Sequence, residues 1–184
     1  MDFLKLVRQR RSVRKYSPKP VPREIIDRCL EAARLAPSAC NSQPWSFIVV
    51  DEEKCKNRLA EEAFSGAYSM NAFAKSAPVL IVVVTERSGY IARLGGYFKG
   101  VQYSLIDIGI ACEHLILQAE EDGLGTCWLG WFNEKAVKKA LDLPNDKKVD
   151  IIISMGYPVE QEYRDKNRKP LDEIRRYVGE KRKT

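Results

Sequence analysis

The residues best suited to bind a charged ligand gather in a short basic segment near the N-terminus, RRSVRKY at 10–16. Arginine guanidinium groups and serine hydroxyls bind phosphate oxygens through charge-assisted, often bidentate, hydrogen bonds. The candidate phosphate ligands in this segment are Arg10, Arg11, Ser12 and Arg14. The alternative is that these side chains form an ordinary solvated basic surface, as most charge runs do.

The distribution of charge along the chain favours a localised anion site. The formal net charge is +6, from 31 Lys and Arg against 25 Asp and Glu. Residues 1–23 carry eight basic side chains and one acidic one, while residues 164–184 carry nine and four, so the stretch between them is acidic on balance. Two basic ends on an acidic body suit an anionic ligand, although we expect about 176–184 to be a solvated basic tail.

Other chemistries lack the residues that they need. The five cysteines are scattered and never spaced as CxxC, which disfavours a disulfide framework or a zinc knuckle and indicates free thiols. His114 is the one histidine of the sequence, so a His-rich metal site is excluded, and a Ser-His or Cys-His pair would depend on this residue alone. We therefore expect no metal and a bound cofactor that supplies the chemistry.

The size and composition predict one domain spanning 1–184, with 45% hydrophobic residues. The longest apolar run, 77–84, is far shorter than the roughly 20 residues of a membrane-spanning helix. The N-terminus has no apolar segment of about 7 to 15 residues followed by a small-residue cleavage site. We therefore expect no membrane partner and a cytoplasmic location.

Short β-branched runs alternate with helical patterns, which predicts an α+β or α/β sandwich. Helices are expected at 2–9, 24–36 and 54–64, and strands at 46–51, 78–85, 126–130 and 150–156. The loop PSACNSQPW at 37–45 lies between the second helix and the first strand, and by itself it is ordinary turn chemistry.

The residues at 98–121 predict a long central helix with two apolar stripes. Apolar residues step by three and four from Phe98 to Ala119, and a second stripe includes Ile106, Ile110 and Leu117. A helix that is apolar on most sides is buried on most sides, and two stripes need two surfaces to cover them. We expect this helix to lie both in the core and at a subunit interface.

Four segments in order resemble the FMN-dependent nitroreductase family. They are RRSVRKY (10–16), APSACNSQPWSFIVV (36–50), DIGIACEHLILQAEEDGLGTCWLGWF (107–132), and MGYP (155–158) followed by KNRKPLDEI (166–174). The resemblance covers nearly the whole chain. It implies an α+β homodimer, a nitroreductase-like sandwich with a mixed, mostly antiparallel sheet flanked by helices, the long central helix at the dimer interface, and two FMN sites between the subunits.

The resemblance implies three groups of cofactor-binding residues. The group on the FMN phosphate and ribityl side is Arg10, Arg11, Ser12, Arg14, Lys166 and Arg168. The group that would reach the flavin of the partner subunit is Pro37, Ser38, Ala39 and Asn41. The group with backbone N–H groups toward the N5 and O4 edge of the ring is Leu129, Gly130 and Trp131. Donors at that edge stabilise the negative charge that develops as hydride arrives.

Several residues keep more than one interpretation. Many relatives have a second glycine where this chain has Trp131, so the indole could cap the pocket, and both this residue and Trp128 could instead pack in the core. Asp107 lies inside an apolar helix and needs a partner, either an N-terminal arginine or the flavin region. Asn71 could touch the flavin or be a surface residue, and His114 is expected to be structural or at an interface.

The expected activity is FMN-dependent oxidoreduction by a ping-pong mechanism, with the chemistry at flavin N5 rather than on a catalytic side chain. NADH or NADPH would act as a transient donor, and a nitroaromatic, quinone or similar small molecule would be the acceptor. The Gly-Leu-Gly at 123–125 follows a helix and precedes a strand, the reverse of a Rossmann turn. The alternatives are reductive dehalogenation, flavin reduction or fragmentation on the same fold, or a basic nucleic-acid-binding protein, which the lack of interleaved aromatics disfavours.

Overall fold

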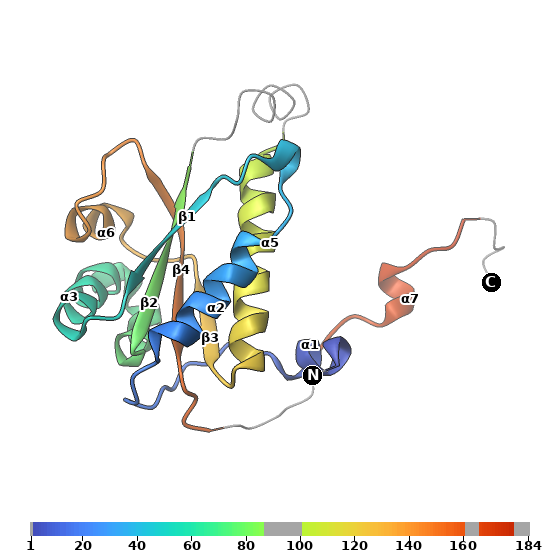
Figure 1. The fold of residues 1–184 in the computed structure, drawn as a ribbon, viewed down its shortest axis with the longest axis horizontal. Helices are drawn as coiled ribbons and strands as arrows, with labels where there is room; N and C mark the ends of the chain where they lie inside the picture. Colours follow the sequence, from blue (N-terminus) through green and yellow to red (C-terminus); the bar gives the residue numbers. More distant parts are fainter. Residues whose placement is uncertain (1, 87–100, 161–165, 179–184) are drawn as a thin grey trace.

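The computed structural model describes residues 2–86, 101–160 and 166–178, and its centre is a four-stranded sheet in the order β1-β2-β4-β3 (Figure 1). The strands are β1 (Trp45–Val50), β2 (Val79–Thr85), β3 (Gly125–Leu129) and β4 (Lys148–Gly156). All three pairings between them are antiparallel. The two central strands are almost entirely buried, and this explains their continuous runs of Val and Ile.

Side chains alternate across the sheet, and each face is covered by helices that bury one of two hydrophobic clusters. Leu80, Val82 and Val84 of β2 face the cluster that includes α3 (Glu53–Ala63) and α6 (Glu134–Ala140). The residues between them face the cluster formed with α2 (Arg23–Arg34) and α5 (Tyr103–Glu121). The expected α+β sandwich with helices on both faces is confirmed.

The N-terminal segment lies beside β3 and contacts it through an isolated parallel bridge, while the four-stranded sheet itself is antiparallel throughout. After α1 (Phe3–Gln9), Ser12 forms a parallel bridge with Thr126, and the backbone N–H of Val13 donates to the Thr126 carbonyl at 2.8 Å. A Cβ added to Gly125 would lie 2.7 Å from the Cβ of Val13, so only glycine allows this close approach. The buried Tyr16 hydroxyl donates to the Val13 carbonyl at 2.7 Å and fixes the far end of the segment.

The expected long helix is shorter than its apolar pattern. α5 begins at Tyr103, with Gln102 as its N-cap residue, so Val101 precedes the helix, and Phe98 lies outside the described residues. Four further elements were not predicted from the sequence. They are η1 (Ala39–Asn41), η2 (Gly66–Ser76), α6 and α7 (Leu171–Ile174).

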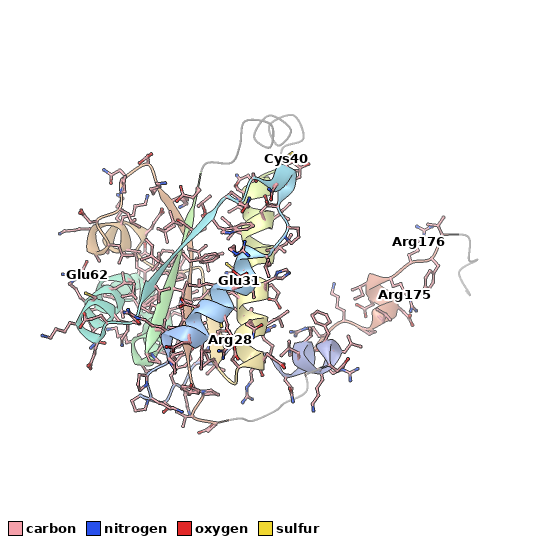
Figure 2. All side chains as sticks on the ribbon, viewed as in Figure 1. Arg28, Glu31, Cys40, Glu62, Arg175 and Arg176 are labelled. Atoms are coloured by element: carbon pink, nitrogen blue, oxygen red, sulfur yellow. The ribbon has the colours of Figure 1, made fainter. Side chains whose placement is uncertain are left out.

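The C-terminal segment with α7 stands apart from the sheet, as the positions of Arg175 and Arg176 show (Figure 2). All of its residues from 167 to 178 are exposed. They include four large apolar or aromatic side chains, namely Leu171, Ile174, Tyr177 and Val178. Across the three described ranges of the chain, no helix has the length and apolar character needed to cross a bilayer.

Candidate active site

The two basic ends of the chain meet beside the last turn of α1. The Lys166 ammonium donates to the Val7 carbonyl at 2.6 Å, and this contact brings Lys166 close to Arg10, the C-cap residue of α1. Burial lowers the pKa of Lys166, and the nearby charges of Arg10 and Arg168 lower it further. The contributions of Arg10 and Arg168 show that three cationic side chains lie close together here, which favours an anionic ligand.

Arg10 carries a buried donor that is not satisfied. Its Nε atom is shielded from solvent and has no hydrogen-bond partner. A buried donor without an acceptor costs free energy, and native structures contain few of them. An anionic oxygen placed in the basic cluster would accept this hydrogen bond, so the geometry at Arg10 fits a phosphate group.

Two carboxylates of α5, Glu113 and Glu120, lie near the same cluster and act on Lys166. Burial raises the pKa of Glu120, near the end of α5, while the positive charges of Arg10, Arg11 and Lys166 partly offset this effect. The Arg11 guanidinium also donates to the Glu160 carbonyl at 2.9 Å. The cluster therefore has Glu120 as a local counter-charge, and Arg11 is held at its edge.

Ser12 and Arg14 lie on the other side of the segment, around Cys127 of β3. Burial raises the pKa of Cys127, and the Arg14 charge, a hydrogen bond with Ser12 and the Arg10 charge all act in the opposite direction. The Arg14 guanidinium lies 5.8 Å from the centroid of the Phe73 ring in η2, within the range of a cation–π contact. Arg10, Ser12 and Arg14 thus lie around Cys127 of β3, and the Arg14 side chain extends toward Phe73 of η2.

Leu129, Gly130 and Trp131 lie at the opposite end of β3 from this basic cluster. Gly130 lies four positions after Thr126, the bridge partner of Ser12, which corresponds to about 13 Å of extended strand. Leu129 is buried, whereas Gly130 is exposed, and a Cβ built on it would meet no atom within 4 Å. An elongated ligand with a phosphate at one end could therefore follow β3 and approach the backbone at Gly130.

Trp131 is not a core residue. Trp131 as a whole residue is 55% exposed, and Trp128 is 38% exposed, so the core-packing interpretation is wrong for both. The Trp131 indole N–H donates to the Ala67 carbonyl at 3.0 Å, and Asn71 donates from its side-chain amide to the Trp131 carbonyl at 2.8 Å. Asn71 therefore serves to tie the loop after β3 to η2.

The loop 37–43 is held in a strained shape by the start of α5. Cys40, Asn41 and Gln43 have positive φ values of 52°, 51° and 45°, which residues with a side chain rarely adopt. Asp107, only 4% exposed, accepts hydrogen bonds from the Ala39 N–H at 3.1 Å and the Ser42 hydroxyl at 3.5 Å. Asp107 is thus held by loop residues rather than by an N-terminal arginine, and Ala39 belongs to the loop that the resemblance assigns to the flavin of the partner subunit.

This loop lies far from the basic cluster of the same subunit. Asp107 and Glu120 are thirteen residues apart on α5, or about 20 Å along the helix axis. Cys40 marks the loop at the end of the molecule where α5 begins, while α1 lies near the other end of α5 (Figure 2). Of the predicted loop residues, Pro37 and Asn41 are exposed, and Ser38 and Ala39 are half-buried.

The remaining candidates have structural contacts. A ring nitrogen of His114, Nδ1, lies 3.3 Å from the Ala32 carbonyl, which links α5 to α2. All five cysteines are free thiols, as expected. Within the ranges that the structure describes, no group of three or more potential metal ligands comes together.

Comparisons with known proteins identify relatives that match most of the chain. A Methanothermobacter thermautotrophicus protein, provisionally named NADH dehydrogenase/NAD(P)H nitroreductase, is 34% identical over an alignment of 164 residues that covers 87% of this chain and 79% of the relative. Iodotyrosine deiodinase 1 of Sus scrofa is 31% identical over 196 residues, with 94% of this chain and 67% of the relative covered.

A solved structure shares the fold over nearly its whole length. The FMN-dependent nitroreductase from Clostridium difficile R20291 aligns with a TM-score of 0.74 and 30% identity, with 97% of this chain and 99% of that chain covered. The model of the nitroreductase family matches residues 7–157, a range that includes Arg10, Ser12 and Arg14 and the whole of β3. This chain belongs to the nitroreductase family.

Proposed function

We propose that the protein is an FMN-dependent oxidoreductase that takes hydride from NADH or NADPH and passes electrons to a small-molecule acceptor. The observation that carries the proposal is the buried, unpartnered Nε of Arg10 inside a basic cluster at one end of β3. The exposed backbone at Gly130, at the other end of the strand, gives the ring of the same cofactor a place to lie. The relatives named NAD(P)H nitroreductase and FMN-dependent nitroreductase support the same choice.

The chain's own residues would bind and orient the cofactor. Arg10, Arg14, Lys166 and Arg168 supply positive charge for the phosphate, and Ser12 supplies a hydroxyl for the phosphate or the ribityl chain. Bound FMN supplies the two-electron chemistry, which no side chain of the site provides. Backbone N–H groups at 129–131 would donate to the ring edge and stabilise the negative charge that appears there on reduction.

The site is proposed to be completed by a second copy of the chain. The loop 37–43 is about 20 Å along α5 from the basic cluster of its own subunit, which favours a role at the partner's flavin. Leu105 and Ile106 on α5, and the apolar side chains of the C-terminal segment, are exposed and would be covered in a homodimer. Sedimentation of the flavin-loaded protein should give a dimer, and a monomer with tightly bound FMN would contradict the shared site.

Half-reactions test the proposed activity directly. Under anaerobic conditions, NADH or NADPH alone should bleach the visible absorbance of the FMN-loaded protein, and an acceptor such as a quinone or nitroaromatic should restore it. A ping-pong mechanism requires that these two half-reactions, reduction by the nucleotide and reoxidation by the acceptor, occur separately. Protein whose absorbance does not respond to either nucleotide, or responds only when acceptor is already present, would contradict the proposal.

Reductive dehalogenation is a second candidate, because the chain is 31% identical to an iodotyrosine deiodinase over 94% of its length. In that case, reduced protein should release iodide from iodotyrosine in proportion to the flavin reoxidised. Reoxidation by quinones without iodide release would favour the nitroreductase-type activity.

A further inference from the structure

The loop after β3 presents an aromatic surface that is held in place from behind. The Trp131 ring centroid lies 5.3 Å from that of Tyr68, with an angle of 48° between the ring planes. The indole N–H donates a hydrogen bond to the Ala67 carbonyl, and the Trp131 carbonyl accepts one from the Asn71 side-chain amide. Rotation of the indole away from η2 would break its hydrogen bond and its ring contact together, so its orientation is fixed.

Trp131 as a whole residue is nevertheless more than half exposed. Its hydrogen-bonding edge points at η2, so the part of the side chain that reaches solvent is apolar aromatic surface. Large exposed aromatic side chains that are held rigidly are typical of binding surfaces, because they lose little conformational entropy on contact. Trp131 follows directly on Gly130, where the backbone is open.

We propose that Trp131, positioned by Tyr68, Ala67 and Asn71, is a specificity-determining residue that forms one wall of the acceptor site and selects flat aromatic acceptors by ring contact. This inference rests on the proposed function, because it assumes that the acceptor binds where the flavin edge is exposed beside Gly130. Offset or tilted aromatic pairs strengthen binding beyond simple burial, by an amount that corresponds to about a two- to tenfold change in affinity. A flat nitroaromatic or quinone would gain this contact, whereas a compact inorganic oxidant would not.

Equilibrium binding provides a test that does not depend on turnover. The dissociation constant of a flat aromatic, 1,4-naphthoquinone, is measured by calorimetry with oxidised, FMN-loaded wild type, Trp131→Ala and Trp131→Phe. We expect Trp131→Ala to weaken binding about two- to tenfold and Trp131→Phe to restore most of the affinity. Trp128→Ala is the matched control, since it removes another exposed indole three residues earlier, on β3, and it should bind like wild type.

A kinetic comparison separates selectivity from general damage. At saturating nucleotide, the ratio of kcat/KM for the quinone to kcat/KM for ferricyanide should fall two- to tenfold in Trp131→Ala, mainly through the KM of the quinone. Equal losses for both oxidants, or weaker FMN binding alone, would assign Trp131 a structural role and overturn the inference. Tighter quinone binding in Trp131→Ala would show that the indole blocks the site instead. Failure of the proposed function has a different signature, namely a wild type that no nicotinamide reduces.

Discussion

Replacing Gly125 by alanine should move the segment that carries the proposed phosphate ligands. The added Cβ would clash with three atoms of Val13, namely Cγ2, which is the nearest, Cβ at 2.7 Å and Cγ1 at 2.9 Å, whereas carbon atoms in contact are about 3.5 to 4.0 Å apart. Because the Val13 Cβ is bonded directly to the backbone, side-chain rotation cannot relieve the clash. The segment at Ser12 and Val13 must shift by about 1 Å from β3, which weakens its pairing with Thr126.

The expected effects follow from overpacking and from misplaced ligands. Overpacking typically lowers the free energy of unfolding by about 1 to 3 kcal/mol, and for a protein of this size each kcal/mol lowers Tm by about 2 to 4 °C. Loss of one charge-assisted hydrogen bond, worth about 1.5 to 3 kcal/mol, would weaken FMN binding by about one to two decades. Riboflavin has no phosphate, so its affinity should change little.

The assay is fluorescence titration of FMN and riboflavin into the apo forms of wild type, Gly125→Ala, Val13→Gly and the double variant. Val13→Gly removes all three atoms that clash, so in the double variant the cost of Gly125→Ala should largely disappear relative to Val13→Gly alone. Wild-type FMN affinity in Gly125→Ala, or strictly additive losses in the double variant, would refute the reasoning.

Two further predictions concern carboxylates on α5. Asp107→Ala leaves the Ala39 N–H without its acceptor and should cost about 1 to 3 kcal/mol of unfolding free energy in urea, whereas Asp107→Asn keeps an acceptor and should lose less. Burial raises the pKa of Glu120, so its ionisation costs stability as pH rises through that pKa, and the cost is absent below the ordinary glutamate pKa of about 4.3. Glu120→Gln should therefore stabilise the protein most near pH 7, and a gain that persists at pH 4 in urea unfolding would contradict this assignment.

The strands could be predicted because strands buried in the core have a recognisable local composition. β2 and β4 are covered on both faces, and only continuous runs of apolar, β-branched residues satisfy that environment. The apolar pattern also led to a wrong predicted start for α5. Apolar spacing reports which positions are buried rather than which are helical, so the pattern ran back to Phe98 although the helix begins at Tyr103.

The elements that were missed depend on contacts distant in sequence. η2 has no strong periodicity, and it is held by the buried Lys56, whose ammonium donates to the Lys75 carbonyl at 2.7 Å, and by the ion pair of Lys75 with Glu61. α6 is only seven residues long, and its signal is the Asn133 side chain, which accepts from the Ala136 N–H as an N-cap. This cap could have been recognised from the sequence.

The residue types of the candidate site were predictable, but their arrangement was not. Arginines in an otherwise acidic chain indicated an anion site, yet only the fold shows that Lys166 reaches Val7 and that Arg10 keeps a buried donor unpartnered. The bonds from Asp107 to Ala39 and from Asn71 to Trp131 span 68 and 60 residues, and no local pattern marks them.

The most direct test of the account is whether the two basic ends of the chain hold one FMN phosphate. FMN and riboflavin are titrated into the apo forms of wild type, Arg10→Ala, Arg168→Ala and the double variant. Arg14→Ala is added for comparison, because the Arg14 guanidinium lies over the Phe73 ring. The account predicts FMN losses of about one to two decades for each single variant, less than additive loss in the double variant, and nearly unchanged riboflavin affinity. Equal losses for FMN and riboflavin, or no loss for either ligand, would contradict it.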